Sequence, residues 1–408
     1  ILAADGTVIA TTDNKTEERI YPYGKVYAHA VGYASNGRMG VEQSAGIYLV
    51  SSNVSLNTKI QDDLADEKHI GNSVYTTFDP GLQQEAYDAL GMYDGAIIVT
   101  QPNTGRILAL VSKPDFDPNT ISEIWNDIVT DSNSSVLVNR ATQGLYPPGS
   151  TFKILTALEY IRENPSTYQN YHFTCNGKFT SGENTIRCFH GTKHGEVDFT
   201  TSFAKSCNSS FANIGLTLSK TNFAQTLKSL YFNQALPVNF ASNSSKVSVD
   251  SGSTDSDLIQ TVIGQGTTQM TPLHLAMITS MIANDGVMME PYMIDRIESA
   301  NGDLIKSYSP TSLGQLISDS EAQSLQNLMS AVIEKGTGTR LSGQSYQVAG
   351  KTGSAEYNSK SDSHAWFTGF SYGTDDPIQI TVIMEGAGSG GEYAVPVAKR
   401  IFDQYYND

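Results

Sequence analysis

Apolar residues recur with two different periods along the chain, which has 408 residues. Residues 81–90 carry leucines and alanines at helical spacing after the turn signal Asp79-Pro80, so a helix is predicted there. Residues 95–100 and 106–112 are apolar runs of strand length, and the sequence Asn-Thr-Gly between them is typical of a turn. These two runs therefore predict a β-hairpin shortly after the helix.

After this hairpin, the pattern predicts a helical stretch followed by a β-rich stretch at the end of the chain. Residues 120–335 are predicted to be mostly helical and rich in loops. The end is predicted to contain three strands, a Gly-rich turn and an amphipathic helix, at residues 346–357, 364–371, 378–384, 386–391 and 394–406. Strands at both ends with helices between them predict an α+β fold, in which helices cover one antiparallel sheet and a helical insertion forms a subdomain.

Residues 1–73 have a different character. Aromatic residues and glycines alternate with polar residues there, and no long helix is indicated. We interpret this region as a small support module, a pedestal or linker. The predicted organisation is thus a small N-terminal region, residues 1–73, followed by one larger domain, residues 74–408.

The chain is strongly acidic, with 26 Lys and Arg against 42 Asp and Glu and a formal net charge of −16. Nucleic acids and anionic membrane surfaces attract basic proteins, so a general binder of either class is excluded. No run approaches the roughly 18 apolar residues of a membrane-spanning helix. Because the chain starts at Ile1 without a signal-peptide pattern, we expect a fragment of a longer protein.

The segment from Tyr146 to Lys153, Tyr-Pro-Pro-Gly-Ser-Thr-Phe-Lys, places a serine and a lysine at the start of a predicted helix. Lys153 lies one helical turn after Ser150 on the same face, where it could act as the base that a serine nucleophile needs. The pattern alone is weak, because Ser202-x-x-Lys205 repeats it. The alternative for either copy is a capped helix with a solvated lysine.

Two further short motifs follow. Ser206-Cys-Asn208 pairs a hydroxyl with an amide, which could relay protons and bind a substrate amide, although both residue types are also common turn formers. Lys351-Thr352-Gly353-Ser354 lies inside a predicted strand. Its lysine and threonine could bind a carboxylate, and its glycine could allow the backbone of a ligand to approach.

The three motifs occur in the order found in penicillin-binding proteins and class A β-lactamases. The same family is indicated by seven flanking segments: residues 79–83, 102–105, 116–119, 139–141, 264–266, 271–273 and 364–370. The chain therefore resembles the class B penicillin-binding proteins of bacteria, the monofunctional D,D-transpeptidases, over most of its length. The resemblance implies a soluble ectodomain of a smaller family member, with a penicillin-binding, serine β-lactamase-like transpeptidase domain.

The resemblance implies four catalytic side chains. Ser150 would be the acylated nucleophile and Lys153 its general base. Ser206 and Asn208 would shuttle protons and hold the amide of the substrate.

It also implies a substrate-binding strand that contains Lys351, Thr352, Gly353 and Ser354. Lys351 and Thr352 would bind the terminal carboxylate of a D-Ala-D-Ala stem peptide. The backbone N–H groups of Ser150 and Ser354 would form the oxyanion hole.

The implied partners are peptidoglycan stem peptides and β-lactam antibiotics, with a membrane glycosyltransferase as a further candidate. The implied location is the extracytoplasmic face of the cell membrane, reached through an anchor that this chain lacks. No cofactor is needed for the chemistry. The alternatives are a serine β-lactamase, which needs a deacylating glutamate such as Glu183 or Glu196, and a β-lactam sensor.

Three cysteines and a histidine form a second candidate site. The spacing Cys175-x12-Cys188-x5-His194-x12-Cys207 supplies the ligand types of a tetrahedral structural zinc site. Such a metal would brace the second motif, because Cys207 lies between Ser206 and Asn208. The alternatives are a Cys175–Cys188 disulfide or three buried thiols, and His172 and His190 could each replace a ligand.

Overall fold

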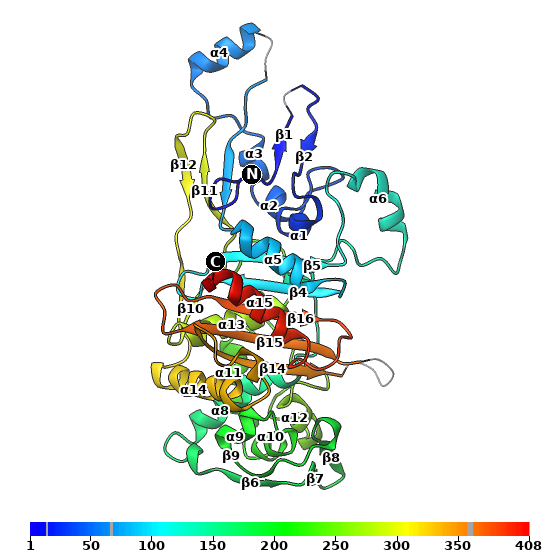
Figure 1. Cartoon of the computed structure of the whole chain (residues 1–408), viewed down its shortest axis with the longest axis vertical. Coiled ribbons are helices and arrows are strands. Elements are labelled where there is room, and N and C mark those ends of the chain that lie inside the picture. Colours follow the sequence, from blue (N-terminus) through cyan, green and yellow to red (C-terminus); the bar gives the residue numbers. More distant parts are fainter. Residues whose placement is uncertain (14, 66–67, 357–361, 408) are drawn as a thin grey trace.

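The chain is elongated and built in three tiers (Figure 1), as a computed structural model that describes residues 1–13, 15–65, 68–356 and 362–407 shows. The N-terminal region forms one end, a five-stranded sheet lies in the middle, and a helical subdomain forms the other end. Tyr357, the last residue of one predicted strand, lies outside the described residues. Within the described part of the chain, no helix is long and apolar enough to cross a lipid bilayer.

The central sheet has the strand order β14-β15-β16-β4-β5, and all neighbouring strands are antiparallel. The predicted hairpin and the three predicted C-terminal strands therefore form one sheet. Strand β14 lies at its edge, so one side of β14 has no partner strand within this sheet. The strands are β4 (Gly95–Thr100), β5 (Ile107–Lys113), β14 (Gln347–Ala355), β15 (His364–Tyr372) and β16 (Gln379–Met384).

Helices cover this sheet, as predicted, and the structure shows them on both faces. On one face, α5 (Pro80–Leu90) and α15 (Ala394–Asn407) share a core with Ile97 and Val99 of β4. On the other face, α13 (Pro272–Ala283) shares a core with Ala96 and Ile98. Successive strand residues point to opposite faces, so a strand that is covered on both sides has the continuous apolar sequence seen here.

The helical subdomain is built around α8 (Lys153–Glu163). The predicted insertion, residues 120–335, also contains eight short strands that were not predicted. Each has only three to five residues, too few for a clear period of two. The other elements of this stretch are α6 (Ile121–Thr130), α7 (Arg140–Gln143), β6 (His172–Cys175), β7 (Lys178–Ser181), β8 (Asn184–Arg187), β9 (Gly195–Asp198), α9 (Phe199–Ala204), α10 (Asn208–Gly215), α11 (Lys220–Ser229), α12 (Asp255–Thr261), β10 (Val287–Met289), β11 (Ile294–Glu298), β12 (Leu304–Ser307), β13 (Ser312–Gln315) and α14 (Asp319–Lys335).

The N-terminal region combines short helices with strands. Its strand β3 (Ser73–Thr76) pairs with β11 from far along the sequence, which joins this region to the rest of the chain. No long helix was predicted here, whereas α4 (Leu56–Ala65) has ten residues, most of them polar, which is why its apolar spacing was inconspicuous. The remaining α-helices and strands of this region are β1 (Thr11–Thr12), β2 (Arg19–Ile20), α1 (Ala28–Val31), α2 (Gly40–Ser44) and α3 (Gly46–Leu49).

Candidate active site

Ser150 lies in a 3₁₀ turn, Gly149–Phe152, that leads directly into α8. Gly149 has φ 54°, in the left-handed region that favours glycine, and its N–H donates to the carbonyl oxygen of Gly264 at 2.9 Å. A Cβ atom on Gly264 would lie 2.0 Å from the Gly149 carbonyl oxygen. Nε1 of Trp366 donates to the carbonyl of Pro147 at 3.1 Å. The turn that carries Ser150 is therefore fixed from two sides.

Lys153 and Lys351 converge on the hydroxyl of Ser206. Nζ of Lys153 lies 3.3 Å from Ser206 Oγ, and it also donates to the Ser206 carbonyl at 2.8 Å and to Oδ1 of Asn208 at 2.6 Å. Nζ of Lys351 lies 3.0 Å from the same Ser206 Oγ. Both lysine side chains are fully buried. Burial lowers the pKa of Lys153 to about 8, and burial together with the charge of Lys153 lowers the pKa of Lys351 well below its ordinary value.

Ser206 and Asn208 lie at the junction of α9 and α10. Ser206 has φ 56°, a left-handed conformation that is uncommon for a residue with a side chain. Cys207 caps α10, with its Sγ accepting from the Ser210 N–H, and Asn208 is the first residue of the helix. Nδ2 of Asn208 donates to the Arg187 carbonyl at 3.0 Å. The second motif is thus held by a helix start on one side and by the end of β8 on the other.

The third motif lies in a strand, as predicted, and this strand, β14, is at the edge of the sheet. Thr352 and Thr337 place their hydroxyl oxygens 2.5 Å apart, and Ser354 Oγ accepts from the Gly390 N–H at 3.2 Å. A Cβ on Gly353 would lie 3.0 Å from the Pro148 carbonyl oxygen. The glycine therefore allows the strand to approach the turn that carries Ser150, whereas the sequence pattern predicted that it admits the backbone of a ligand.

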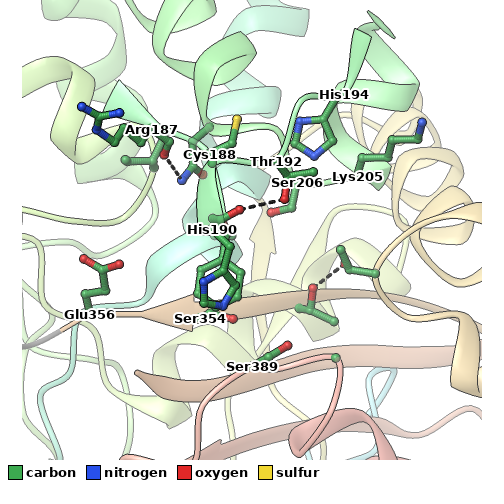
Figure 2. Close-up of a pocket in the computed structure, with 18 of the residues that line it drawn as sticks. Arg187, Cys188, His190, Thr192, His194, Lys205, Ser206, Ser354, Glu356 and Ser389 are labelled. Carbon is green, nitrogen blue, oxygen red and sulfur yellow. Dashed lines mark hydrogen bonds between the residues drawn. The ribbon is translucent and has the colours of Figure 1, made fainter. Parts of the chain in front are cut away.

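One cavity of about 800 Å³ brings these motifs together (Figure 2). Neither Glu183 nor Glu196, the two candidates for a deacylating glutamate, is among the residues that line it. The second Ser-x-x-Lys copy is not a site of this kind, because Ser202 is fully buried and accepts a hydrogen bond from Ser210. The lining includes Ser150, Ser206, Asn208, Thr352 and Ser354 from the motifs, and also Arg187, Lys205, Thr337, Arg340, Glu356 and Glu392.

Thr337 is the main site residue that no sequence motif predicted. It lies just after α14, 15 positions before its partner Thr352. Its surroundings, Lys-Gly-Thr-Gly, match none of the motifs considered. Only the packing of α14 beside β14 brings the two hydroxyls together.

The predicted Cys/His set also comes together, beside the second motif. The ligand atoms of Cys175, Cys188, His194 and Cys207 all lie within 4.8 Å of one another. Sγ of Cys188 lies 3.6 Å from Sγ of Cys175 and 3.8 Å from Sγ of Cys207, and Nδ1 of His194 lies 3.4 Å from Cys175. All three cysteines are buried free thiols. His190 and His172 are not part of this cluster.

The geometry and charge of this cluster fit a tetrahedral zinc ion. Zn–S bonds of about 2.3 Å imply S–S edges of about 3.8 Å, close to the separations observed. A hydrogen bond from Cys207 lowers the pKa of Cys188 to about 3, and the same contact raises the pKa of Cys207. Closely packed thiols cannot all ionise beside one another, so a divalent cation is what would permit three thiolates.

The site can be compared with known proteins. A sequence profile of the penicillin binding protein transpeptidase domain matches residues 95–403, and a profile of the penicillin binding protein A dimerisation domain matches residues 1–74. The chain belongs to the penicillin-binding protein transpeptidase family. The predicted resemblance to class B penicillin-binding proteins and the predicted fold class are therefore confirmed. Transpeptidases of this family need no catalytic cofactor.

Individual relatives agree with this assignment. The peptidoglycan D,D-transpeptidase PbpA of Mycolicibacterium smegmatis is 28% identical over 432 residues, covering 98% of this chain and 87% of the relative. The D,D-transpeptidase domain of a peptidoglycan glycosyltransferase from Eggerthella lenta has a TM-score of 0.89 at 28% identity, covering 100% and 97% of the two chains. Penicillin-binding protein A of M. tuberculosis, solved as a ceftriaxone acyl-enzyme complex, has a TM-score of 0.89 at 25% identity, covering 99% and 97%.

Proposed function

We propose that this penicillin-binding protein is a serine-type peptidoglycan D,D-transpeptidase that cross-links stem peptides through an acyl ester on Ser150. The observation that carries the proposal is the convergence of two buried lysines on Ser206 Oγ, at the wall of the cavity that also holds Ser150. The activity named for the M. smegmatis relative and the acyl-enzyme of the M. tuberculosis protein support it.

In the first half-reaction, Ser150 Oγ attacks the carbonyl carbon of the penultimate D-alanine of the donor. Neutral Lys153 accepts the hydroxyl proton, and its lowered pKa makes the neutral form accessible near neutral pH. The backbone N–H groups of Ser150 and Ser354 stabilise the tetrahedral oxyanion. The C–N bond then breaks, and a proton delivered through Ser206 allows the last D-alanine to leave as an amine.

In the second half-reaction, the amine of a neighbouring stem attacks the ester carbonyl and the C–O bond to Ser150 breaks. Neutral Lys153 takes the proton that the amine loses and returns it to Ser150 Oγ. Asn208 holds the amide of the donor. Lys351 and Thr352, on a strand that Gly353 brings close to the nucleophile's turn, bind the donor's terminal carboxylate. We add Thr337 to the residues that bind the carboxylate, because its hydroxyl contacts that of Thr352.

A β-lactam would mimic the donor and leave a long-lived ester. The alternatives are a serine β-lactamase and a β-lactam sensor. The β-lactamase requires a deacylating glutamate, and the two candidates, Glu183 and Glu196, do not line the cavity.

Intact-mass spectrometry before and after penicillin tests this proposal. A stable adduct of one intact drug that is absent in Ser150→Ala is the expected result. Ser202→Ala, in the second Ser-x-x-Lys copy, is the matched control and should still be acylated. Rapid drug consumption without an adduct would indicate a β-lactamase, and neither adduct nor consumption would overturn the proposal.

We also infer that Cys175, Cys188, His194 and Cys207 hold a structural zinc ion. The ion would fix the start of α10, because Cys207 is the N-cap residue of this helix and precedes Asn208. All four positions of a tetrahedron are filled by side chains, so the ion would have no open position for catalysis.

Metal analysis of two histidine variants tests the zinc proposal. His194→Ala should lose the metal and melt at a lower temperature, as should Cys188→Ser. His190→Ala is the matched control and should retain the metal, because His190 lies outside the cluster. The proposal would be contradicted if the unsubstituted protein contained no metal and Cys188→Ser were as stable as the unsubstituted protein.

The remaining assignments are parts of the same proposal. Residues 1–73 would form a pedestal region and residues 74–408 the transpeptidase domain, a division supported by the two profile matches. Because its substrate would be peptidoglycan, the domain would act on the extracytoplasmic face of the membrane. Cross-linking consumes newly polymerised glycan, so a membrane glycosyltransferase is the class of partner that must supply it.

A further inference from the structure

A short loop between two residues of the Cys/His cluster lies over the active-site cavity. It runs from Cys188 to His194 and contains a 3₁₀ turn, Phe189–Gly191. The Cys188 N–H donates to the Gly177 carbonyl at 3.0 Å, and the Gly191 N–H donates to the Cys188 carbonyl at 2.8 Å. The loop is thus fixed at both ends by cluster residues and near its start by the turn after β6.

His190 at the centre of this loop has an unfavourable backbone conformation. Its φ of 51° and ψ of 23° lie in the left-handed region, which costs a residue with a side chain on the order of 1 kcal/mol. Such strain persists only where the surrounding structure enforces it, and it is concentrated at functional sites. The strained conformation presents the imidazole to the cavity, where Figure 2 shows it directed toward Ser354.

The neighbouring Phe189 is a large apolar side chain that remains 40% exposed. Its ring centroid lies 4.0 Å from that of His190, so the two rings form one aromatic surface. Both residues line the cavity that contains Ser150 and an adjoining cavity of about 670 Å³. An exposed aromatic surface at the junction of two cavities is typical of a binding subsite.

The edge strand β14 indicates which part of a substrate would reach this surface. Thr352, Ser354 and Glu356 follow one another at every second position and all line the first cavity, so they share one face of the extended segment. A donor peptide that adds along this edge with its carboxylate at Thr352 and its reacting carbonyl at Ser354 continues toward Glu356. Glu356, Phe189 and His190 line both cavities, so this continuation passes the two rings.

We propose that Phe189 and His190 form a subsite for the part of the acyl donor that precedes its penultimate D-alanine. In a β-lactam the equivalent part is the acylamino side chain, whose amide plane and rings would pack on the aromatic surface. The subsite rests on the proposed transpeptidase function. It adds a determinant of selectivity outside the three catalytic motifs.

Two penicillins with the same nucleus test the subsite. Benzylpenicillin carries an aromatic acylamino side chain, whereas 6-aminopenicillanic acid carries a free amine at that position. The second-order rate constants for acylation of Ser150 by each compound give a selectivity ratio. We expect Phe189→Ala to lower this ratio about tenfold, as loss of an aromatic anchor does in other binding sites.

His190→Gly provides a second, independent variant. Glycine relieves the left-handed backbone strain, so its effect reports the missing imidazole, and we expect the ratio to fall by about three- to tenfold. His172→Ala is the matched control, because His172 is an exposed histidine of the same subdomain that lines neither cavity. Melting temperature and metal content are measured for every variant.

The outcomes separate this inference from the proposed function. An unchanged ratio in His190→Gly and in a folded Phe189→Ala would overturn the subsite. If Phe189→Ala fails to fold, the ratio in His190→Gly decides the question alone. If neither penicillin acylates the unsubstituted chain, the transpeptidase proposal fails and the subsite falls with it.

Discussion

Oε1 of Glu385 accepts a hydrogen bond from the Tyr146 hydroxyl at 2.6 Å, which ties the segment ahead of Ser150 to the end of strand β16. The same oxygen accepts from Nε of Arg140 at 2.7 Å. The backbone of Tyr146 is in turn paired with Met270 in both directions. The segment that contains the two prolines before Ser150 is therefore fixed at its first residue, Tyr146, by a charge-assisted hydrogen bond.

Tyr146→Phe removes this contact with little change in volume. A hydrogen bond to a charged group contributes about 1.5–3 kcal/mol to the stability of the fold. Its loss should also allow Ser150 to move from its reactive position. We expect the rate constant for acylation by benzylpenicillin to fall about fivefold to tenfold. The measurement is time-resolved intact-mass spectrometry of the acyl-enzyme.

Tyr346→Phe is the matched control for this prediction. The Tyr346 hydroxyl donates to Oδ1 of Asp403 at 2.7 Å, a contact of the same chemistry between β14's start and α15. It should lower the melting temperature without slowing acylation. Equal effects of the two variants on acylation would show that the contact of Tyr146 has no positioning role.

Gly264→Ala should displace the turn that carries Ser150. Gly264 has φ 73°, and the added Cβ would lie 2.0 Å from the Gly149 carbonyl oxygen. The clash involves backbone and cannot be relieved by rotating a side chain. We expect acylation to slow by more than about 100-fold, because a displacement of about 1 Å at a reacting group has effects of that size.

Gly182→Ala controls for the cost of the left-handed backbone itself. Gly182 has φ 59°, and nothing lies within 4 Å of its ideal Cβ position. Alanine there should cost on the order of 1 kcal/mol of stability and leave the acylation rate unchanged. Comparable acylation rates in the two alanine variants would contradict the role assigned to Gly264.

The site could be predicted from the sequence wherever its residues lie in short motifs. Ser150 and Lys153 are neighbours on one helical turn, and Lys351 to Ser354 lie on one strand, so local spacing already fixes their relation. The Cys/His set was predictable for a different reason, because its residue types are rare in this chain.

Other features depend on long-range packing. Thr337 reaches Thr352 only because α14 packs beside β14, and no local pattern marks it. Gly353 was assigned to a ligand, whereas the Pro148 carbonyl fills the space that its missing side chain leaves. The short strands β6 to β9 were missed because each has only four residues.

The acylation rate should depend on pH through Lys153. The base must be neutral to accept the Ser150 proton, and burial lowers the pKa of Lys153 to about 8. The rate should therefore rise about tenfold per pH unit below 8 and level off above it. Lys351 acts in the opposite direction, because it must stay charged to bind the carboxylate, and burial together with the charge of Lys153 lowers its pKa as well.

Stopped-flow acylation between pH 5.5 and 10 would test this profile, with the melting temperature followed in parallel. A rate that does not change between pH 6 and 8 would contradict the assignment of Lys153 as the general base.

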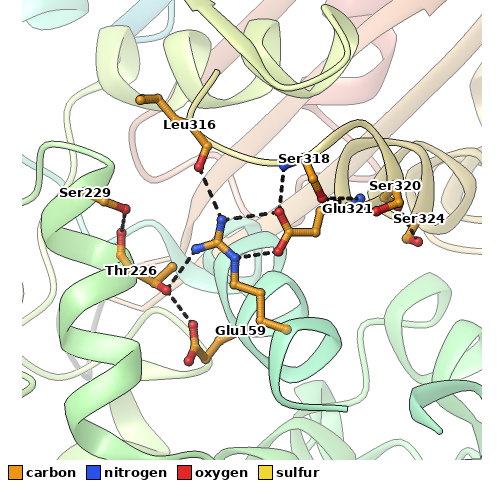
Figure 3. A network of polar contacts seen from close by, with 9 residues as sticks. Glu159, Thr226, Ser229, Leu316, Ser318, Ser320, Glu321 and Ser324 are labelled. Atoms are coloured by element: carbon orange, nitrogen blue, oxygen red, sulfur yellow. Dashed lines mark hydrogen bonds and ion pairs between the residues drawn. The ribbon is translucent and has the colours of Figure 1, made fainter. Parts of the chain in front are cut away.

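The far end of α8 is held by a charged network that should stabilise the fold (Figure 3). Arg162 donates to both carboxylate oxygens of Glu321, at 2.6 and 3.3 Å, and also to Thr226 at 3.0 Å and to the Leu316 carbonyl at 3.2 Å. The Thr226 hydroxyl donates in turn to the buried Glu159. The network joins α8, α11 and α14 at the end of α8 that lies opposite Lys153.

Arg162→Met should therefore reduce stability. The substitution leaves Glu321 without its ionic partner in a site where its side chain is only 17% exposed, and losing one partner of such a pair costs about 3 kcal/mol. Arg400→Met removes a similar 2.7 Å contact, to Glu85, but Arg400 is 51% exposed, so the expected loss is below about 1 kcal/mol. Urea unfolding measures both changes. The acylation rate of the folded Arg162→Met chain should match that of the unsubstituted chain, because Lys153 keeps its contacts with Ser206 and Asn208; a slower rate would show that the network also positions the base.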